Sequence, residues 1–123
     1  MIDADLVRAM FERMRRAGVN TGEPLLWGYF FFDTDRERLQ NAGILLARRS
    51  YTVVGVRADE RDEDGGPETH TLHVERVETH SIESLLAKND ELDAFARACG
   101  LLAYDGMEVG EIPGPSPDGD APN

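Results

Sequence analysis

The order in which helix-like and strand-like segments follow one another constrains the fold of this chain most. Continuous or alternating apolar residues indicate strands, and apolar residues at helical spacing indicate helices. The pattern predicts an N-terminal helix followed by strand, helix, strand, strand, helix and strand, over residues 3–18, 25–32, 34–49, 51–57, 69–77, 81–99 and 101–111. This order is typical of a ferredoxin-like βαββαβ sandwich of the α+β class. We therefore expect an antiparallel four-stranded sheet in spatial order 4-1-3-2, with two helices on one face.

The N-terminal helix is an addition to that order. Asp3 or Asp5 can cap it, and Gly18 supplies its stop. Its apolar positions follow helical spacing and are Leu6, Met10, Phe11, Met14 and Ala17. We expect this helix to cover part of the core or to protect an edge of the sheet.

The first strand, residues 25–32, carries most of the aromatic side chains. Alternation along a strand places Trp27, Tyr29 and Phe31 on one face and Phe30 and Phe32 on the other. A strand that is apolar on both sides favours a central position, covered on both faces or buried in a dimer.

Several local signals refine this description. Thr34 and Glu37 have the spacing of a capping box at the start of the first covering helix. Gly43 in that helix suggests close approach to a neighbouring strand. Polar residues 88–90 interrupt the apolar stripe of the second covering helix and predict a kink there. Residues 105–106, Asp-Gly, predict a turn or bulge in the last strand.

Length and composition indicate one soluble domain. The 123 residues, of which 41% are hydrophobic and 30% charged, suffice for one core. We expect a folded domain over residues 1–112 and a disordered Pro/Gly/Asp tail over 113–123. The single cysteine and the absence of a signal-like segment favour a reducing, cytoplasmic setting.

The formal net charge of −11 is unevenly distributed. Residues 59–68 hold six acidic residues against one basic residue, whereas residues 1–58 hold nine arginines against seven acidic residues. An acidic surface repels phosphate backbones and attracts a basic protein surface. The charge therefore disfavours nucleic acid as a direct partner and is otherwise consistent with simple solubility.

Histidine and cysteine are sparse, and the abundant carboxylates show no sequence pattern that places an acid/base pair in a pocket. The three histidines, His70, His73 and His80, are too few and too badly spaced for a metal site, and the first two point to opposite faces of one strand, so we expect simple surface histidines. Cys99 lies on the apolar stripe of its helix, and Ser81 is placed to cap that helix. We therefore expect no catalytic residues, no metal site, no cofactor and no enzymatic activity.

A motif near the end of the predicted domain resembles a known family. Tyr104-Asp105-Gly106-Met107-Glu108 is similar to the Tyr-Asp-Gly-Trp motif of the regulators of ribonuclease E activity, type B. The resemblance extends over roughly residues 5–112 and includes Gly22-Glu23-Pro24, Arg49–Val53 and the spacing of Ser81, Leu92, Ala96 and Gly100. The chain departs from the family pattern at Met107, where tryptophan is usual, at Ser50, where glycine is usual, and in its short C-terminal tail.

The resemblance implies a ferredoxin-like sandwich and a non-enzymatic role, the binding and modulation of an RNA-processing endoribonuclease. The candidate protein-binding residues are those of the acidic hairpin and of the motif: Asp59, Glu60, Asp62, Glu63, Asp64, Tyr104, Asp105, Gly106, Met107 and Glu108. The partner is expected to present a basic surface, and no membrane association is expected.

Two other functions remain open on the sequence alone. One is a small-ligand-binding regulatory domain that acts as a dimer, with Trp27 reporting the ligand. The other is single-stranded RNA binding through the aromatic strand, in which Tyr29 and Phe31 would stack on bases. The acidic charge ranks RNA binding last.

Overall fold

The computed structural model describes residues 4–59 and 67–110. Its elements are α1 (Ala4–Arg16), β1 (Leu25–Asp33), α2 (Arg36–Ala47), β2 (Thr52–Ala58), β3 (His70–Glu78), α3 (Ile82–Ala98) and β4 (Ala103–Gly110). Each agrees with its predicted range to within two residues. The tail expected over 113–123 and the domain boundary expected at residue 112 lie outside the described residues. No helix in the described ranges is long and apolar enough to cross a membrane.

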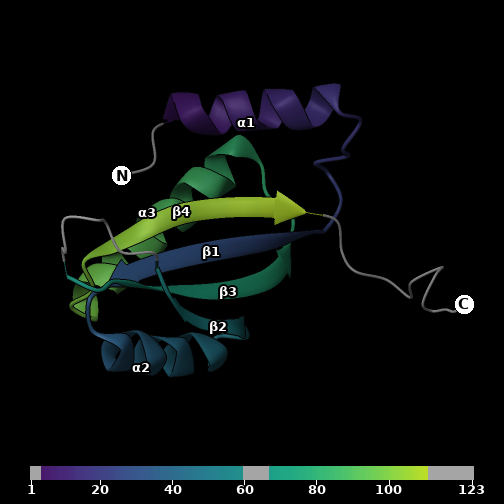
Figure 1. Ribbon diagram of the computed structural model, residues 1–123. Helices are drawn as coiled ribbons and strands as arrows, with labels where there is room; N and C mark the ends of the chain where they lie inside the picture. Colours follow the sequence, from purple (N-terminus) through teal and green to yellow (C-terminus); the bar gives the residue numbers. More distant parts are fainter. Residues whose placement is uncertain (1–3, 60–66, 111–123) are drawn as a thin grey trace, which may run out of the picture.

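The four strands form one antiparallel sheet in the order β2-β3-β1-β4 (Figure 1). Read from the other edge, this is the predicted order 4-1-3-2, and the α+β class is confirmed. β1 lies in the middle of the sheet, where Tyr29 is paired with Val74 of β3 on one side and with Met107 of β4 on the other.

The core lies on one face of the sheet. Trp27, Tyr29 and Phe31 of β1 are at most 1% exposed, as the alternation predicted. α2 packs against β1, β2 and β3, and α3 packs against β4. The Phe31 ring meets the Phe95 ring of α3 edge-on, with 5.9 Å between centroids. Gly43 of α2 approaches the sheet closely, since an added Cβ would lie 3.4 Å from the Leu72 side chain. That expectation is confirmed.

The opposite face of the sheet, which we call the open face, is covered by no helix of the described residues (Figure 1). Phe30 of β1 stacks there on His73 of β3, with ring centroids 4.5 Å apart. Gly28 lies beneath His73 and Glu108, and a Cβ on it would approach His73 Nε2 to 2.9 Å. The open face therefore carries a half-buried aromatic pair beside acidic side chains.

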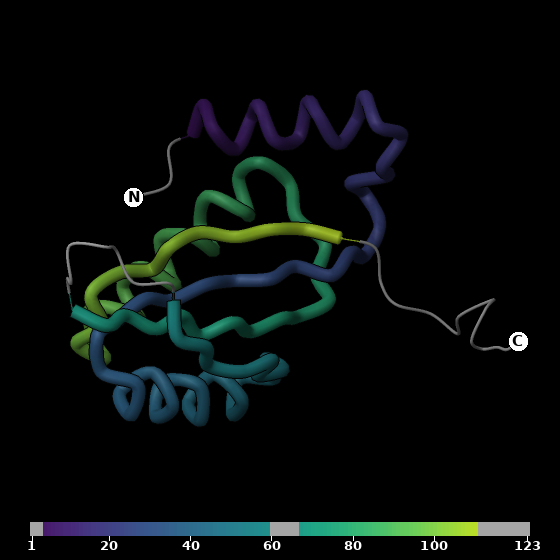
Figure 2. The backbone as a smooth tube through the Cα atoms, in the orientation of Figure 1, coloured from purple at the N-terminus to yellow at the C-terminus, as the bar shows by residue number. Residues whose placement is uncertain are grey.

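Helix α1 lies beside the edge strand β4 and covers that side of the core (Figure 1). Figure 2 shows the chain leaving α1 and turning back to enter β1. The Phe11 and Trp27 rings stack with centroids 6.4 Å apart, and Val7 is fully buried. The prediction that Leu6 belongs to the apolar face is wrong, because Leu6 is 49% exposed and Val7 takes the inward position. α1 packs mainly against α3.

The three helices of residues 4–59 and 67–110 end with the same pair of backbone hydrogen bonds. At the end of α1, Gly18 N–H bonds to Arg15 O and Val19 N–H bonds to Met14 O. The same pair is repeated after α2 and α3 at positions Ser50–Tyr51 and Gly100–Leu101. This arrangement needs a left-handed residue, and Gly18, Ser50 and Gly100 have φ of 83°, 74° and 74°. Ser50 is the one non-glycine residue among the three.

Two sequence predictions about helices are wrong. α3 is continuous through residues 88–90, because Lys88 and Asn89 turn inward to the hydroxyls of Tyr51 and Tyr104 instead of breaking the helix. α2 is capped by Asp35 rather than by Thr34, since the Asp35 carboxylate accepts hydrogen bonds from the backbone N–H groups of Glu37 and Arg38. The bulge predicted at residues 105–106 is confirmed by the register shift between β1 and β4.

The corrected cap gives a direct prediction. Asp35→Ala leaves two backbone N–H groups at the start of α2 without their acceptor, and we expect it to lower the free energy of unfolding by about 1 kcal/mol. Thr34→Ala, one residue earlier, is the matched control and is expected to change the stability by less than about 0.5 kcal/mol. Urea denaturation measures both, and a larger loss in the Thr34 variant would contradict the assignment.

Candidate functional site

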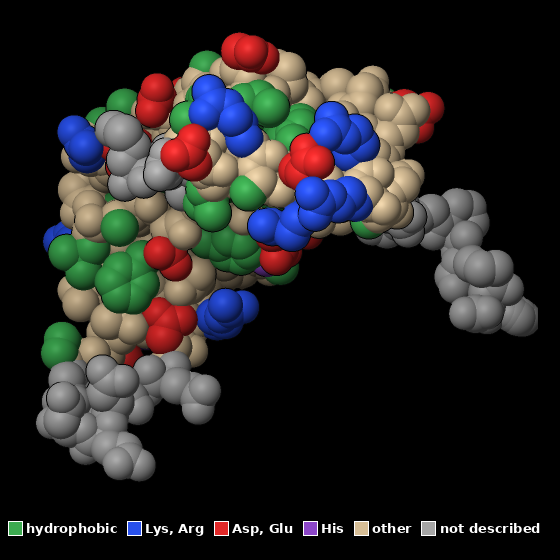
Figure 3. Space-filling model, turned by 90° about the horizontal axis from the view of Figure 1, so that it is seen from above, with side chains coloured by type: hydrophobic (Ala, Val, Ile, Leu, Met, Phe, Trp, Pro, Cys, Tyr) green, Lys and Arg blue, Asp and Glu red, His purple; other side chains and the backbone are tan. Residues whose placement is uncertain are grey.

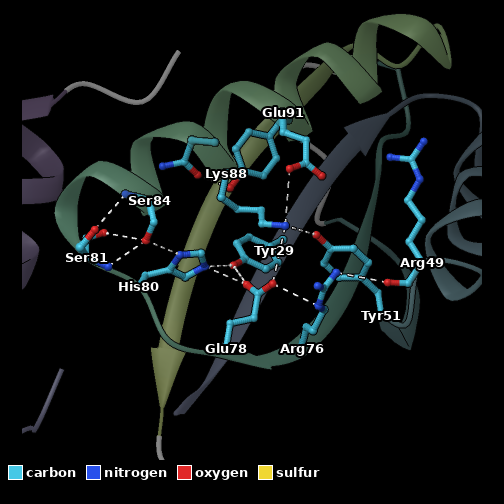
Figure 4. Close-up of polar contacts among 12 residues, drawn as sticks. Tyr29, Arg49, Tyr51, Arg76, Glu78, His80, Ser81, Ser84, Lys88 and Glu91 are labelled. Atoms are coloured by element: carbon cyan, nitrogen blue, oxygen red, sulfur yellow. Dashed lines mark hydrogen bonds and ion pairs between the residues drawn. The ribbon is translucent and has the colours of Figure 1, made fainter. Parts of the chain in front are cut away.

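A cluster of polar side chains joins the end of β3 to α3 and to the middle of β1 (Figure 4). Glu78 lies at its centre. Its Oε2 accepts a hydrogen bond from the Tyr29 hydroxyl and lies 2.8 Å from His80 Nε2. Its Oε1 lies 3.1 Å from Arg76 Nε and 3.6 Å from Lys88 Nζ. Both carboxylate oxygens of Glu78 are therefore held by donors from three elements and the turn after β3.

The cluster continues outward from these partners. Lys88 Nζ donates to the Tyr51 hydroxyl at 2.7 Å, and the Arg76 guanidinium lies over the Tyr51 ring at 4.8 Å (Figure 4). On the other side, His80 Nδ1 is 3.0 Å from Ser84 Oγ. The short contact of His80 Nε2 with a carboxylate requires a proton on Nε2.

Local sequence spacing builds this cluster. Arg76 and Glu78 are two residues apart on β3, so both point to the core face, in line with Leu72 and Val74. Ser84 and Lys88 are one helical turn apart, so they share a face of α3. From the sequence, Glu78 has no assigned role, His80 is expected at the surface and Lys88 is expected to interrupt the helix. The alternation on β3 and the one-turn spacing on α3 were the signals available.

The environment shifts the protonation equilibria in the cluster. Burial alone would raise the pKa of Glu78, but hydrogen bonds from His80 and Tyr29 and the charge of Lys88 outweigh it and lower the pKa from 4.5 to about 2. Burial and the hydrogen bond to Glu78 raise the pKa of the Tyr29 hydroxyl. Burial would lower the pKa of Lys88, but its contacts with Tyr51 and Glu78 raise it.

These contacts make the cluster a fixed connection between elements. The Glu78 and Lys88 side chains are only about a tenth exposed, at 10% and 11%, and each is committed to several partners. The tyrosine hydroxyl stays protonated and the carboxylate stays charged at neutral pH. The role that this arrangement supports is structural, because its hydrogen bonds and ion pairs hold α3 against the sheet.

The predicted contact residues of the Tyr-Asp-Gly motif are divided between two faces of β4. Tyr104 lies on the core face, where its hydroxyl donates to Asn89 Oδ1 at 2.6 Å and its burial raises its pKa. Met107 also lies on the core side and is half-buried. Gly106 and Glu108 lie on the open face, and Asp105 is exposed at the bulge. The surface they offer is therefore mainly Asp105, Glu108 and the rim of Met107.

Of the predicted acidic hairpin, residues 59–68, the structure describes Asp59 and residues 67–68. The Asp59 carboxylate accepts hydrogen bonds from the Thr71 and Thr69 hydroxyls, at 2.8 and 3.0 Å. Asp59 therefore links the end of β2 to the start of β3. Glu60, Asp62, Glu63 and Asp64 lie outside the described residues, and their role in protein binding stays a prediction.

The histidines are not the surface residues that the sequence suggested. His70 and His80 are each 8% exposed, because His70 faces the core opposite Asp33 and His80 belongs to the polar cluster. His73 lies on the open face, so His70 and His73 do point to opposite faces as predicted.

Cys99 is half-buried, and burial raises the pKa of its thiol. Within the described ranges, no three His, Cys, Asp or Glu side chains are grouped to hold a metal.

The rings proposed for RNA stacking lie in the core. Tyr29 and Phe31 are 0% exposed, and so are not available to bases. The aromatic side chains of β1 on the other face, Phe30 and Phe32, are half-buried, and Phe30 is already stacked on His73. This arrangement contradicts the RNA-binding alternative in the form in which the sequence suggested it.

Fold and site together define a small α+β domain in which the polar cluster stabilises the fold. The exposed side chains, such as those on β4, are available to a partner. Comparison with protein families gives the particular assignment. The family described as regulator of ribonuclease activity B matches residues 4–109, and the chain belongs to this family. The resemblance seen in the sequence is thereby confirmed. No curated protein matches the chain.

Proposed function

We propose that this protein is a non-enzymatic regulator that binds an RNA-processing endoribonuclease of the ribonuclease E type and lowers its activity. The observation that carries the proposal is the family match over residues 4–109. The match takes in all three helices and all but the last residue of the sheet. Regulation of ribonuclease activity is the property of the family, and the kind of ribonuclease and the direction of the effect are what we propose.

The charge of the chain supports a physical route for this regulation. A ribonuclease must present basic side chains to the phosphates of its RNA substrate. A protein with a net charge of −11 is attracted to the same side chains and can occupy them in place of RNA. The exposed acidic side chains Asp105 and Glu108 on β4 are available for such contacts. Inhibition by occupation of a basic surface requires no reacting group in the regulator.

An RNA-cleavage assay tests the proposal. The initial rate at which a purified ribonuclease E-type enzyme cuts a single-stranded RNA should fall to a plateau as this protein is added. The apparent affinity should be higher at low salt than at moderate salt, because exposed charges are screened within about 8–10 Å. A ribonuclease of an unrelated family serves as the matched control and should be unaffected.

Direct binding of the protein to the RNA is measured in parallel, without enzyme, by fluorescence anisotropy. Inhibition without RNA binding supports the proposal. An unchanged cleavage rate, or a fall in rate that follows the protein's own RNA binding, contradicts it.

A further inference from the structure

Strand β4 is an edge of the sheet with an unpaired outer side. It pairs with β1 alone, and its backbone makes no other backbone hydrogen bond within the described residues. A strand edge of this kind presents a row of N–H and C=O groups to any extended chain that approaches it. The register shift in β4 falls near its start and leaves residues 106–110 in continuous register with β1, whereas the other edge strand, β2, has its shift in the middle, between Val53 and Gly55, where it hinders pairing with a further strand.

An apolar hollow follows the free side of β4. It measures about 460 Å³ and lies between α1 and the strand, with Met10 and Met14 on one wall and Met107 and Val109 on the other. A second hollow of about 220 Å³ continues along the same strand past Asp105 and Met107. We call the two together the β4 trough. Its larger part has the volume of a pocket that receives a ligand, and its methionine side chains adapt readily to different apolar groups.

The two sides of β4 differ in charge. Seen from above, hydrophobic side chains gather in the hollow beside α1, and charged side chains stand around them (Figure 3). Glu108 on the open face is 64% exposed, and Asp105 at the bulge is also exposed. Arg13 of α1 lies on the opposite wall of the trough and lines both hollows. An occupant of the trough therefore meets apolar groups on the core side and the Glu108 carboxylate on the open-face side, while the Asp105 carboxylate and Arg13 lie in the smaller hollow itself.

We propose that the β4 trough binds an extended segment of a partner protein, in which apolar and basic residues alternate, as a fifth strand of the sheet. Successive side chains of a strand point to opposite faces, so one set fills the apolar trough and the other set reaches Glu108 on the open face. The backbone of the segment pairs with the free edge of β4. The inference deepens the proposed function, and rests on it in taking the partner to be a protein, but its test needs no ribonuclease.

A fluorescein-labelled peptide of about nine residues, with lysine and valine in alternation, is long enough to span a strand and serves as the probe. Its binding to the full chain is measured by anisotropy. Two further versions carry N-methyl groups on alternate residues, one on the odd set and one on the even set. Only one edge of an added strand pairs with β4, so one methylated version should bind roughly tenfold more weakly than the other. Equal affinities would overturn strand addition.

Protein variants locate the binding site. Glu108→Lys should weaken the peptide roughly tenfold, because it reverses the charge beside the added strand. Glu83→Lys, an exposed position on α3 away from the trough, makes the same change in net charge and should weaken it less than about twofold. Circular dichroism confirms that both variants are folded. Equal weakening by the two would show attraction by net charge alone and would overturn the site.

Amide hydrogen exchange of the complex supplies the second measurement. Added pairing should slow exchange in residues 105–110 of β4 and leave β2 unchanged. Protection of β2 instead would overturn the assignment to this edge. If the peptide binds as described while the ribonuclease assay shows no inhibition, the binding site at the β4 trough is supported and the proposed ribonuclease target is contradicted. If inhibition occurs without peptide binding, strand addition at the trough is contradicted and the proposed regulation is supported.

Discussion

Replacing Phe31 by alanine is expected to lower the free energy of unfolding by about 3–5 kcal/mol. The ring is fully buried in the middle strand, and it contacts Phe95 of α3 and Tyr104 of β4 at centroid distances of 5.9 and 5.3 Å. Its removal leaves a cavity where three elements meet, and a packed interior fills such a cavity only in part. Chemical denaturation monitored by Trp27 fluorescence measures the loss.

Phe30→Ala is the matched control, because Phe30 is the neighbouring residue on the same strand and carries the same ring. It is half-buried on the open face, where it stacks on His73, so we expect a loss of only about 1–2 kcal/mol. A Phe30 variant less stable than the Phe31 variant would show that the core lies on the other face of the sheet. The pair thus tests the assignment of faces as well as the size of the effect.

Glu78→Gln is the second substitution with a large expected effect, a loss of about 2–4 kcal/mol in the free energy of unfolding. The glutamine keeps the shape of the side chain but removes the charge that Arg76, Lys88 and His80 surround. Removing the carboxylate charge leaves the buried positive charges without a counter-charge, and this destabilises the folded state. Glu83→Gln, on the exposed surface of α3, is the control and should stay within about 0.5 kcal/mol of the wild type.

The same carboxylate predicts a pH dependence of stability. The pKa of Glu78 is lowered from 4.5 to about 2 in the folded protein, so the unfolded state binds the proton more readily. Its contribution is therefore complete above about pH 5 and is lost as the pH falls toward 2; in total it amounts to about 3 kcal/mol. Denaturation curves across this range should show a steeper decline for the wild type than for Glu78→Gln. Parallel declines would contradict the role of Glu78.

The fold was accessible from the sequence because its signals are short-range and repeated. Alternation placed Trp27, Tyr29 and Phe31 on the core face, and Gly18 and Gly100 mark helix ends that the structure confirms. The Asp-Gly bulge in β4 followed from the ordinary preferences of those two residues in turns. The order of elements, together with the right-handedness of crossover connections, then left few possible sheet topologies.

The polar cluster was not accessible, because it depends on side chains far apart in the chain. Lys88 and Asn89 read as a break in an apolar stripe when α3 is considered alone. They are buried polar residues whose partners, Tyr51 and Tyr104, come from before β2 and from β4. His80 looked like a surface residue for the same reason, since its carboxylate and tyrosine partners are visible only in three dimensions. The β4 trough likewise requires the position of α1 beside the strand.

The left-handed turn at Ser50 has a consequence for how related chains are compared. A serine occupies a backbone conformation that costs an L-residue about 1–2 kcal/mol relative to glycine, yet the turn keeps both hydrogen bonds found at the two glycine ends. The adjoining Tyr51, only 4% exposed, anchors the chain directly after it. The hydrogen-bonded turn at this corner is therefore formed with serine as it is with glycine at the other two helix ends. When related chains are compared, serine and glycine at this position are compatible with the same backbone turn.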